Sequence, residues 1–261
     1  MSEQAVRLSV ELHGRELSAD VPVLVLGPSL GTTAAMWHPV LPYLQDVRVA
    51  IYSLRGHGGS QTPPGPYTLD DLVADVVGVM EQLSLPRAHQ VGVSLGGMVA
   101  LGLATTRPDL VESVVPVASS AHPRNRDQWL QRAAEVRAHG MAAVADSSLQ
   151  RWFTDDFQSD PEARTAHQNL LAVEAEGYAG CCEALADIDL RQQVTGIEVP
   201  ALVLAGEQDP AFGPEHAEAL RGSLPGARLT VIEHSAHLPP TQQPRAVADA
   251  LRDFLGLPAI T

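Results

Sequence analysis

The sequence predicts an α/β fold, with a mostly parallel sheet of eight strands and helices on both of its faces. Short apolar and β-branched runs alternate with stretches in which apolar residues recur at helical spacing. Most of the apolar runs are continuous, as in parallel strands that are buried on both sides. Between residues 122 and 192 strand-like runs disappear while helical stretches continue, which indicates a helical lid inserted after the sixth strand.

The eight expected strands follow one another along the chain. Residues 5–12 and about 15–19 are expected to form an antiparallel pair at one edge of the sheet. The other strands are expected at 23–26, 49–52, 90–93, 113–117, 201–205 and 228–232. Pro116 lies in the sixth strand and lacks the N–H that a central strand donates, so we expect a bulge or an early strand end there.

Helices are expected between most of these strands. The stretch 70–83 is the clearest, because it follows Thr68, a residue type that caps helix N-termini. Further helical stretches are expected at 34–44, 95–106, 128–139, 140–153, 214–224 and 243–255. This organisation predicts a core of residues 1–121 and 193–261, with residues 122–192 as the lid.

Composition limits the classes of function. Of the 261 residues, 45% are hydrophobic and 18% charged, the balance of a folded protein with a large core. The net charge of −14 disfavours nucleic acid and anionic membranes as partners. The chain starts without a signal-peptide pattern and has only two cysteines, side by side, so we expect a cytoplasmic protein. Without a metal-ligand cluster or a dinucleotide-binding glycine pattern, no metal or cofactor is expected.

A catalytic serine is indicated by the Gly-Val-Ser-Leu-Gly-Gly run at residues 92–97. An apolar strand runs directly into Ser94, and an apolar, alanine-rich helix runs directly out of it. This strand–turn–helix presents a serine hydroxyl at the carboxyl end of a sheet, on a sharp turn that requires flanking glycines. We therefore expect Ser94 to act as a nucleophile.

A serine needs a base, and the base needs an orienting acid. Asp209 follows the strand at 201–205 and His237 follows the last strand, so both should lie at the same sheet edge as Ser94. We predict Ser94, Asp209 and His237 as the catalytic triad, with His234 and Glu207 as less favoured alternatives for base and acid. His57 is expected to be a structural loop histidine.

The tetrahedral intermediate of such chemistry needs two N–H donors. The residue after the nucleophile, Leu95, should supply one of them. The loop at 27–33, after the third expected strand, should supply the other, and Leu30 is the expected donor.

These motifs together resemble the α/β-hydrolase superfamily over nearly the whole chain, and the resemblance implies an α/β-hydrolase fold. A narrower resemblance is to 3-oxoadipate enol-lactonases. It is carried by residues 30–33 with 36–37, and by 64–69, 140–143, 151–154 and 177–185. The last two runs fall in the lid, where substrate choice is normally made.

The resemblance implies hydrolysis of a small enol-lactone that bears a carboxylate, giving 3-oxoadipate through an acyl-enzyme. The chain departs from that family at Pro28, where Asn is usual, and at Ser53, where Asp is usual. Both positions lie near the oxyanion loop or the pocket rim. A carboxylesterase or perhydrolase acting on another small ester is therefore the alternative.

An anionic small-molecule substrate would need a local positive charge in a chain of net charge −14. The lid offers arginines for this purpose and tryptophans as apolar walls. The candidate substrate-binding residues are Arg124, Arg126, Arg151, Trp129 and Trp152.

Overall fold

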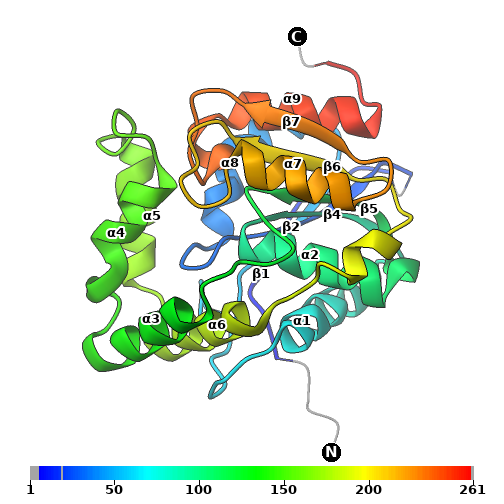
Figure 1. The fold of residues 1–261 in the computed structure, drawn as a ribbon. Helices are drawn as coiled ribbons and strands as arrows, with labels where there is room; N and C mark the ends of the chain where they lie inside the picture. Colours follow the sequence, from blue (N-terminus) through cyan, green and yellow to red (C-terminus); the bar gives the residue numbers. More distant parts are fainter. Residues whose placement is uncertain (1–5, 19, 260–261) are drawn as a thin grey trace, which may run out of the picture.

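The computed structural model describes residues 6–18 and 20–259, which form a sheet with helices packed around it (Figure 1). Seven strands of this part of the chain form one sheet, in the order β1-β3-β2-β4-β5-β6-β7. Strand β1 runs antiparallel to β3, and the other neighbours are parallel. The strands are β1 Val10–His13, β2 Val23–Gly27, β3 Arg48–Tyr52, β4 Ala88–Val93, β5 Val111–Val117, β6 Leu202–Gly206 and β7 Arg228–Ile232.

Helices cover both faces of the sheet, and α9 lies on the opposite side from α1 and α2 in Figure 1. As expected, Thr68 caps α1: its hydroxyl accepts the Asp71 N–H while the Asp71 carboxylate accepts the Thr68 N–H. The core helices are η1 Ala34–Tyr43, α1 Leu69–Gln82, α2 Leu95–Thr106, η2 Pro108–Leu110, η3 Gln193–Gly196, α7 Pro214–Ser223, α8 Pro239–Gln242 and α9 Pro244–Leu255. None of the helices in the described part is long and apolar enough to cross a bilayer.

The sheet has one strand fewer than predicted. Residues 15–18 do not form a strand, because the Leu17 N–H donates to the Gly14 carbonyl at 3.1 Å and closes a turn. Gly14 allows this turn with a φ of 68°. Strand β1 therefore pairs with β3 instead, from Val10 opposite Tyr52 onward. Residues 5 and 19, at the ends of the two predicted strands, lie outside the described residues.

The prediction of a bulge or early end at Pro116 is also wrong, since β5 continues to Val117 and Pro116 stays in register with Gly92 of β4. The missing N–H of Pro116 would face β6. On that side the ladder is carried by the N–H groups of Val114 and Ala118, which donate to Pro200 and Leu204. The strand thus tolerates proline because its pairing with β4 does not use the absent donor.

Four helices lie between β5 and β6 in the chain, inside the segment 122–192, and gather to one side of the core (Figure 1). They are α3 Arg126–His139, α4 Ala142–Trp152, α5 Pro161–Leu171 and α6 Ala175–Asp187. Two backbone hydrogen bonds attach them to core loops: Glu174 N–H donates to the Gly56 carbonyl at 3.0 Å, and Leu238 N–H donates to the Trp152 carbonyl at 3.1 Å. Because these core loops follow β3 and β7, the four helices cover the carboxyl ends of the strands.

An ion cluster fixes the two longest of these helices to each other and to the core. Arg137 of α3 donates to Glu176 at 2.8 Å and to Glu183 at 2.5 Å, and both carboxylates belong to α6. Glu176 also accepts the N–H of Gly65, which precedes α1, at 2.8 Å. The hydrogen bond from Arg137 lowers the pKa of Glu176 to about 2.

This cluster predicts a pH-dependent contribution to stability. The folded-state pKa of Glu176 lies below its usual value near 4.5, so its ionised form stabilises the fold fully above that pH. The contribution is lost as the pH falls from about 4.5 toward 2. The melting temperature of Glu176→Gln should therefore lie below that of the wild type at pH 7, and the difference should shrink below pH 4.5. Glu198→Gln, at an exposed position before β6, is the control; a difference that stays constant down to pH 3.5 would contradict the assignment.

Candidate active site

Ser94 occupies a strained turn between β4 and α2, with φ 53° and ψ −115°. The turn requires glycine on both sides. A Cβ at Gly92 would lie 2.2 Å from the backbone of Gly96, and a Cβ at Gly96 would lie 2.7 Å from the backbone of Gly27. The Ser94 N–H donates to the Val117 carbonyl at 2.9 Å, which ties the turn to the end of β5. The local sequence therefore holds the serine at the carboxyl edge of the sheet.

His237 and Asp209 meet at the same edge. The imidazole Nδ1 donates to Asp209 Oδ2 at 2.8 Å, and both side chains are buried. The two loops that carry them are joined by backbone hydrogen bonds, from Gln208 N–H to the Ser235 carbonyl and from Glu207 N–H to the Ile232 carbonyl. A carboxylate that accepts from Nδ1 leaves Nε2 as the basic nitrogen, which is the tautomer a general base needs.

The environment of Asp209 keeps it ionised despite its burial. Burial acts most strongly and disfavours the charged form. The charge and hydrogen bond of His237, together with the N–H groups of Ala211 and Phe212, outweigh it and lower the pKa of Asp209. One of these donors, Ala211 N–H, lies 2.8 Å from Oδ1. Asp209 is therefore a fixed negative charge behind the imidazole.

The less favoured candidates for base and acid lie outside the pair formed by His237 and Asp209. His234 and Glu207 are both exposed, and Glu207 Oε2 accepts the His234 N–H at 3.0 Å. His57 is fully buried, and its Nε2 accepts the N–H of Gly31 at 3.1 Å. The geometry thus brings His237 and Asp209 together and leaves these three residues outside the pair.

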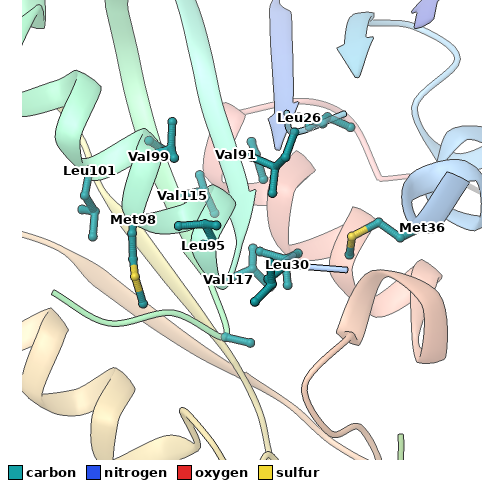
Figure 2. Close-up of a cluster of buried hydrophobic side chains, with 14 of the residues drawn as sticks. Leu26, Leu30, Met36, Val91, Leu95, Met98, Val99, Leu101, Val115 and Val117 are labelled. Atoms are coloured by element: carbon teal, nitrogen blue, oxygen red, sulfur yellow. The ribbon is translucent and has the colours of Figure 1, made fainter. Parts of the chain in front are cut away.

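The two expected oxyanion donors lie on adjoining segments. The Gly96 N–H donates to the Pro28 carbonyl at 3.2 Å, so the loop that carries Leu30 is fastened to the start of α2, where Leu95 lies. The Leu30 and Leu95 side chains belong to one buried cluster with Met36 and Val117 (Figure 2). In the part of the chain that the structure describes, no hydrogen bond engages either backbone N–H, as an oxyanion hole requires.

The five predicted substrate-binding residues differ in position. Arg124 and Arg126 are exposed, and Arg126 donates to Asp187 at the surface, at 2.7 Å. Trp129 is half-buried, whereas Trp152 is buried and its carbonyl accepts from the residue after His237. Arg151 is half-buried. Burial and then the charge of Arg132 lower the pKa of Arg151, while the charge of Asp209 acts in the opposite direction.

Arg132 is a candidate site residue that the sequence analysis missed. Its guanidinium donates to the Tyr178 hydroxyl and to Ser148 Oγ, both at 2.7 Å, and lies over the Tyr178 ring. Within the described ranges neither Arg132 nor Arg151 forms an ion pair with a carboxylate. The signal in the sequence was the spacing of Trp129 and Arg132, which places both on one face of α3.

No group of three or more His, Cys, Asp and Glu side chains in residues 6–18 and 20–259 is placed to hold a metal ion. The two cysteines are buried in α6 as free thiols. Burial raises the pKa of Cys182 to about 12 and raises that of Cys181 well above its usual value, so both stay protonated at neutral pH.

The fold and this edge of the sheet define a class of protein. Residues 22–242 match the family described as the alpha/beta hydrolase fold, and the chain belongs to that family. It is a hydrolase of the α/β type, with Ser94 at the turn characteristic of the fold.

Particular relatives include enol-lactonases and an esterase. The chain is 37% identical to 3-oxoadipate enol-lactonase 2 of Acinetobacter baylyi, over 96% of this chain and 94% of that protein. The crystal structure of the enol-lactonase from Burkholderia xenovorans LB400 superposes with a TM-score of 0.92 at 35% identity, covering 98% of this chain and 99% of that one. A malate-bound thermophilic esterase from Thermogutta terrifontis superposes with a TM-score of 0.89 at 28% identity, covering 96% and 93%.

The assignment of nucleophile and base predicts different effects on kcat for substitutions of Ser94, His237 and His234. Ser94→Ala and His237→Ala should each lower kcat by on the order of 10⁴ with the fold intact, because either change removes the nucleophile or its base. His234→Ala should stay within about tenfold of the wild type, because the side chain is exposed and outside the pair. Hydrolysis of p-nitrophenyl acetate measures kcat, and circular dichroism checks the fold. A dead His234→Ala beside an active His237→Ala would reverse the assignment.

Proposed function

We propose that the protein hydrolyses a small enol-lactone bearing a carboxylate, converting 3-oxoadipate enol-lactone into 3-oxoadipate through an acyl-enzyme on Ser94. The proposal rests on one observation above the others. The charges of Arg132 and Asp209 both act on Arg151, and in the described chain neither arginine forms an ion pair with a carboxylate, as a binding site for an anionic substrate would require. The enol-lactonase names of the relatives agree with this substrate.

The proposed reaction runs in two acyl-transfer steps. His237 Nε2 takes the proton of the Ser94 hydroxyl as its oxygen attacks the lactone carbonyl, and the N–H groups of Leu30 and Leu95 stabilise the oxyanion. Collapse of this intermediate breaks the ring C–O bond, and the enol oxygen leaves with a proton from His237. The enol tautomerises to the ketone. Water, deprotonated by His237, then cleaves the acyl-enzyme and releases the second carboxylate.

The arginine pair explains how a chain of net charge −14 would hold an anion. Two guanidinium groups placed close together repel each other, and this repulsion contributes to the lowered pKa of Arg151 after burial itself. A substrate carboxylate between them would relieve the repulsion and satisfy the unused N–H donors. A hydrogen bond to a charged group of this kind contributes about 1.5–3 kcal/mol.

An open-chain ester with a carboxylate is the second candidate substrate. The observation that favours it is the esterase from Thermogutta terrifontis, whose structure holds malate, a dicarboxylate. The same serine, histidine and oxyanion donors would cleave such an ester. The two candidates differ in the leaving group, which stays attached to the acyl chain only in the lactone. Comparing kcat/KM for 3-oxoadipate enol-lactone and for its open-chain methyl ester with the same charge decides between them.

The two arginines give a prediction that compares KM for a charged substrate with KM for a neutral one. Arg132→Met and Arg151→Met should each raise KM for the enol-lactone by about 10- to 150-fold, the equivalent of one charged hydrogen bond. KM for p-nitrophenyl acetate, which is neutral, should change less than about threefold. Arg126→Met is the matched control on α3, because that guanidinium pairs with Asp187 at the surface. Equal effects on charged and neutral substrates in both variants would refute the carboxylate-binding role.

A further inference from the structure

His57 lies in the loop after β3 and is held in a single tautomer. Its ring is completely buried, and Nδ1 is 2.7 Å from the carbonyl oxygen of Arg55. A carbonyl oxygen only accepts, so Nδ1 carries the proton and Nε2 presents a lone pair. That lone pair accepts the N–H of Gly31 at 3.1 Å. The histidine therefore joins the loop after β3 to the loop after β2 as a neutral acceptor.

The hydrogen bond from Gly31 bears on the orientation of Leu30. The peptide plane between Leu30 and Gly31 contains the Gly31 N–H, so His57 fixes that plane. The preceding plane contains the Ser29 carbonyl and the Leu30 N–H, which point in opposite directions. The Ser29 carbonyl accepts from the Thr32 N–H at 3.1 Å and from the Thr32 hydroxyl at 2.8 Å. Both planes that flank Leu30 are thus fixed, one by Thr32 and the other by His57.

The surroundings of His57 suit an acceptor rather than a proton carrier. Burial lowers the pKa of His57 to about 4, so the ring stays neutral where the enzyme would work. Its ring stacks on Tyr178 of α6, with centroids 6.4 Å apart. Gly31 has a φ of 81°, and a Cβ there would lie 2.7 Å from Leu170 and 3.1 Å from Tyr178. Only glycine therefore fits at position 31, where the loop that donates to His57 packs against the same tyrosine as the His57 ring.

We infer that His57 is a positioning residue of the oxyanion hole: by accepting the Gly31 N–H it fixes one of the two peptide planes that flank Leu30 and so, together with Thr32, keeps the Leu30 N–H directed at the oxyanion. This inference rests on the serine chemistry of the proposed function and does not depend on which ester is hydrolysed. His57 acts through Leu30 and touches no reacting atom.

Two substitutions separate the two hydrogen bonds of His57. In His57→Gln the amide oxygen reaches about as far as Nε2 and can still accept from Gly31. In His57→Asn the amide can replace Nδ1 toward Arg55 but is too short to reach Gly31. His57→Asn should lower kcat for p-nitrophenyl acetate by about 10- to 100-fold, since a misdirected donor loses most of its effect on the oxyanion. KM should change less than about threefold, and His57→Gln should keep kcat within about fivefold of the wild type.

A tetrahedral ligand provides a readout that a purely structural role would not move. Phenylboronic acid forms a tetrahedral adduct with a catalytic serine and places an oxygen in the oxyanion hole. Its inhibition constant should rise in His57→Asn by the same factor by which kcat falls, and not in His57→Gln. His89→Asn is the matched control, because His89 is a half-buried histidine of β4 bonded to Ser113. It should change the melting temperature only.

Further measurements keep the test decisive. If His57→Asn does not fold, Thr32→Val removes the hydroxyl that fixes the other peptide plane and should show the same loss of kcat and boronate affinity. The ¹⁵N NMR spectrum of the wild-type imidazole should show a protonated Nδ1 and an unprotonated Nε2. Wild-type kcat and boronate affinity in His57→Asn, or equal losses in the Asn and Gln variants, would overturn the inference. An active Ser94→Ala would instead overturn the serine chemistry, and failure to hydrolyse the lactone would overturn only the proposed substrate.

Discussion

The close approach of two backbones, where β4 meets α2, is the constraint on which the site depends. No side chain fits at Gly92 or Gly96, and this absence lets the strand turn into the helix within one residue. The strained residue at the turn is Ser94. The same contact brings the Gly96 N–H to the Pro28 carbonyl, so the nucleophile and the oxyanion loop are positioned by one packing arrangement. A larger side chain at either glycine would disturb both at once.

Charge is distributed unevenly between the body of the protein and its active site. The chain carries 31 acidic and 17 basic residues, and most arginines at its surface are matched with carboxylates, such as Arg107 with Asp109. At the candidate site the arrangement differs. Asp209 is paired with His237, while Arg132 donates to a tyrosine and a serine, and its charge lowers the pKa of Arg151. Under the proposed carboxylate-binding role of these two arginines, the acidic exterior would favour a small anion over a large polyanion, which it would repel.

Much of this site could be predicted from the sequence, because parallel strands bring their carboxyl ends to one edge. Asp209 and His237 each follow an apolar run, and the structure joins them by a hydrogen bond. The edge strand at 15–19 could not be excluded from the sequence, since the turn that replaces it depends on the backbone conformation of Gly14 and on the hydrogen bond from the Leu17 N–H. The prediction of a bulge or early strand end at Pro116 was wrong for a related reason. The effect of a missing N–H depends on which neighbouring strand it would face, and the sequence does not show that. Arg132 was missed because its place is set by Tyr178 of another helix.

The hydrogen bond between the Leu238 N–H and the Trp152 carbonyl has a consequence for protein engineering. It joins the end of α4 to the residue directly after His237, so the helical insertion is not an independent module resting on the core. A chimaera that exchanged residues 122–192 for the corresponding segment of another hydrolase would also replace the backbone that supports the histidine loop. Transplanting specificity within this fold therefore requires that the junction at Trp152 be preserved, and substitutions confined to the inner faces of α3 and α4 are the safer route.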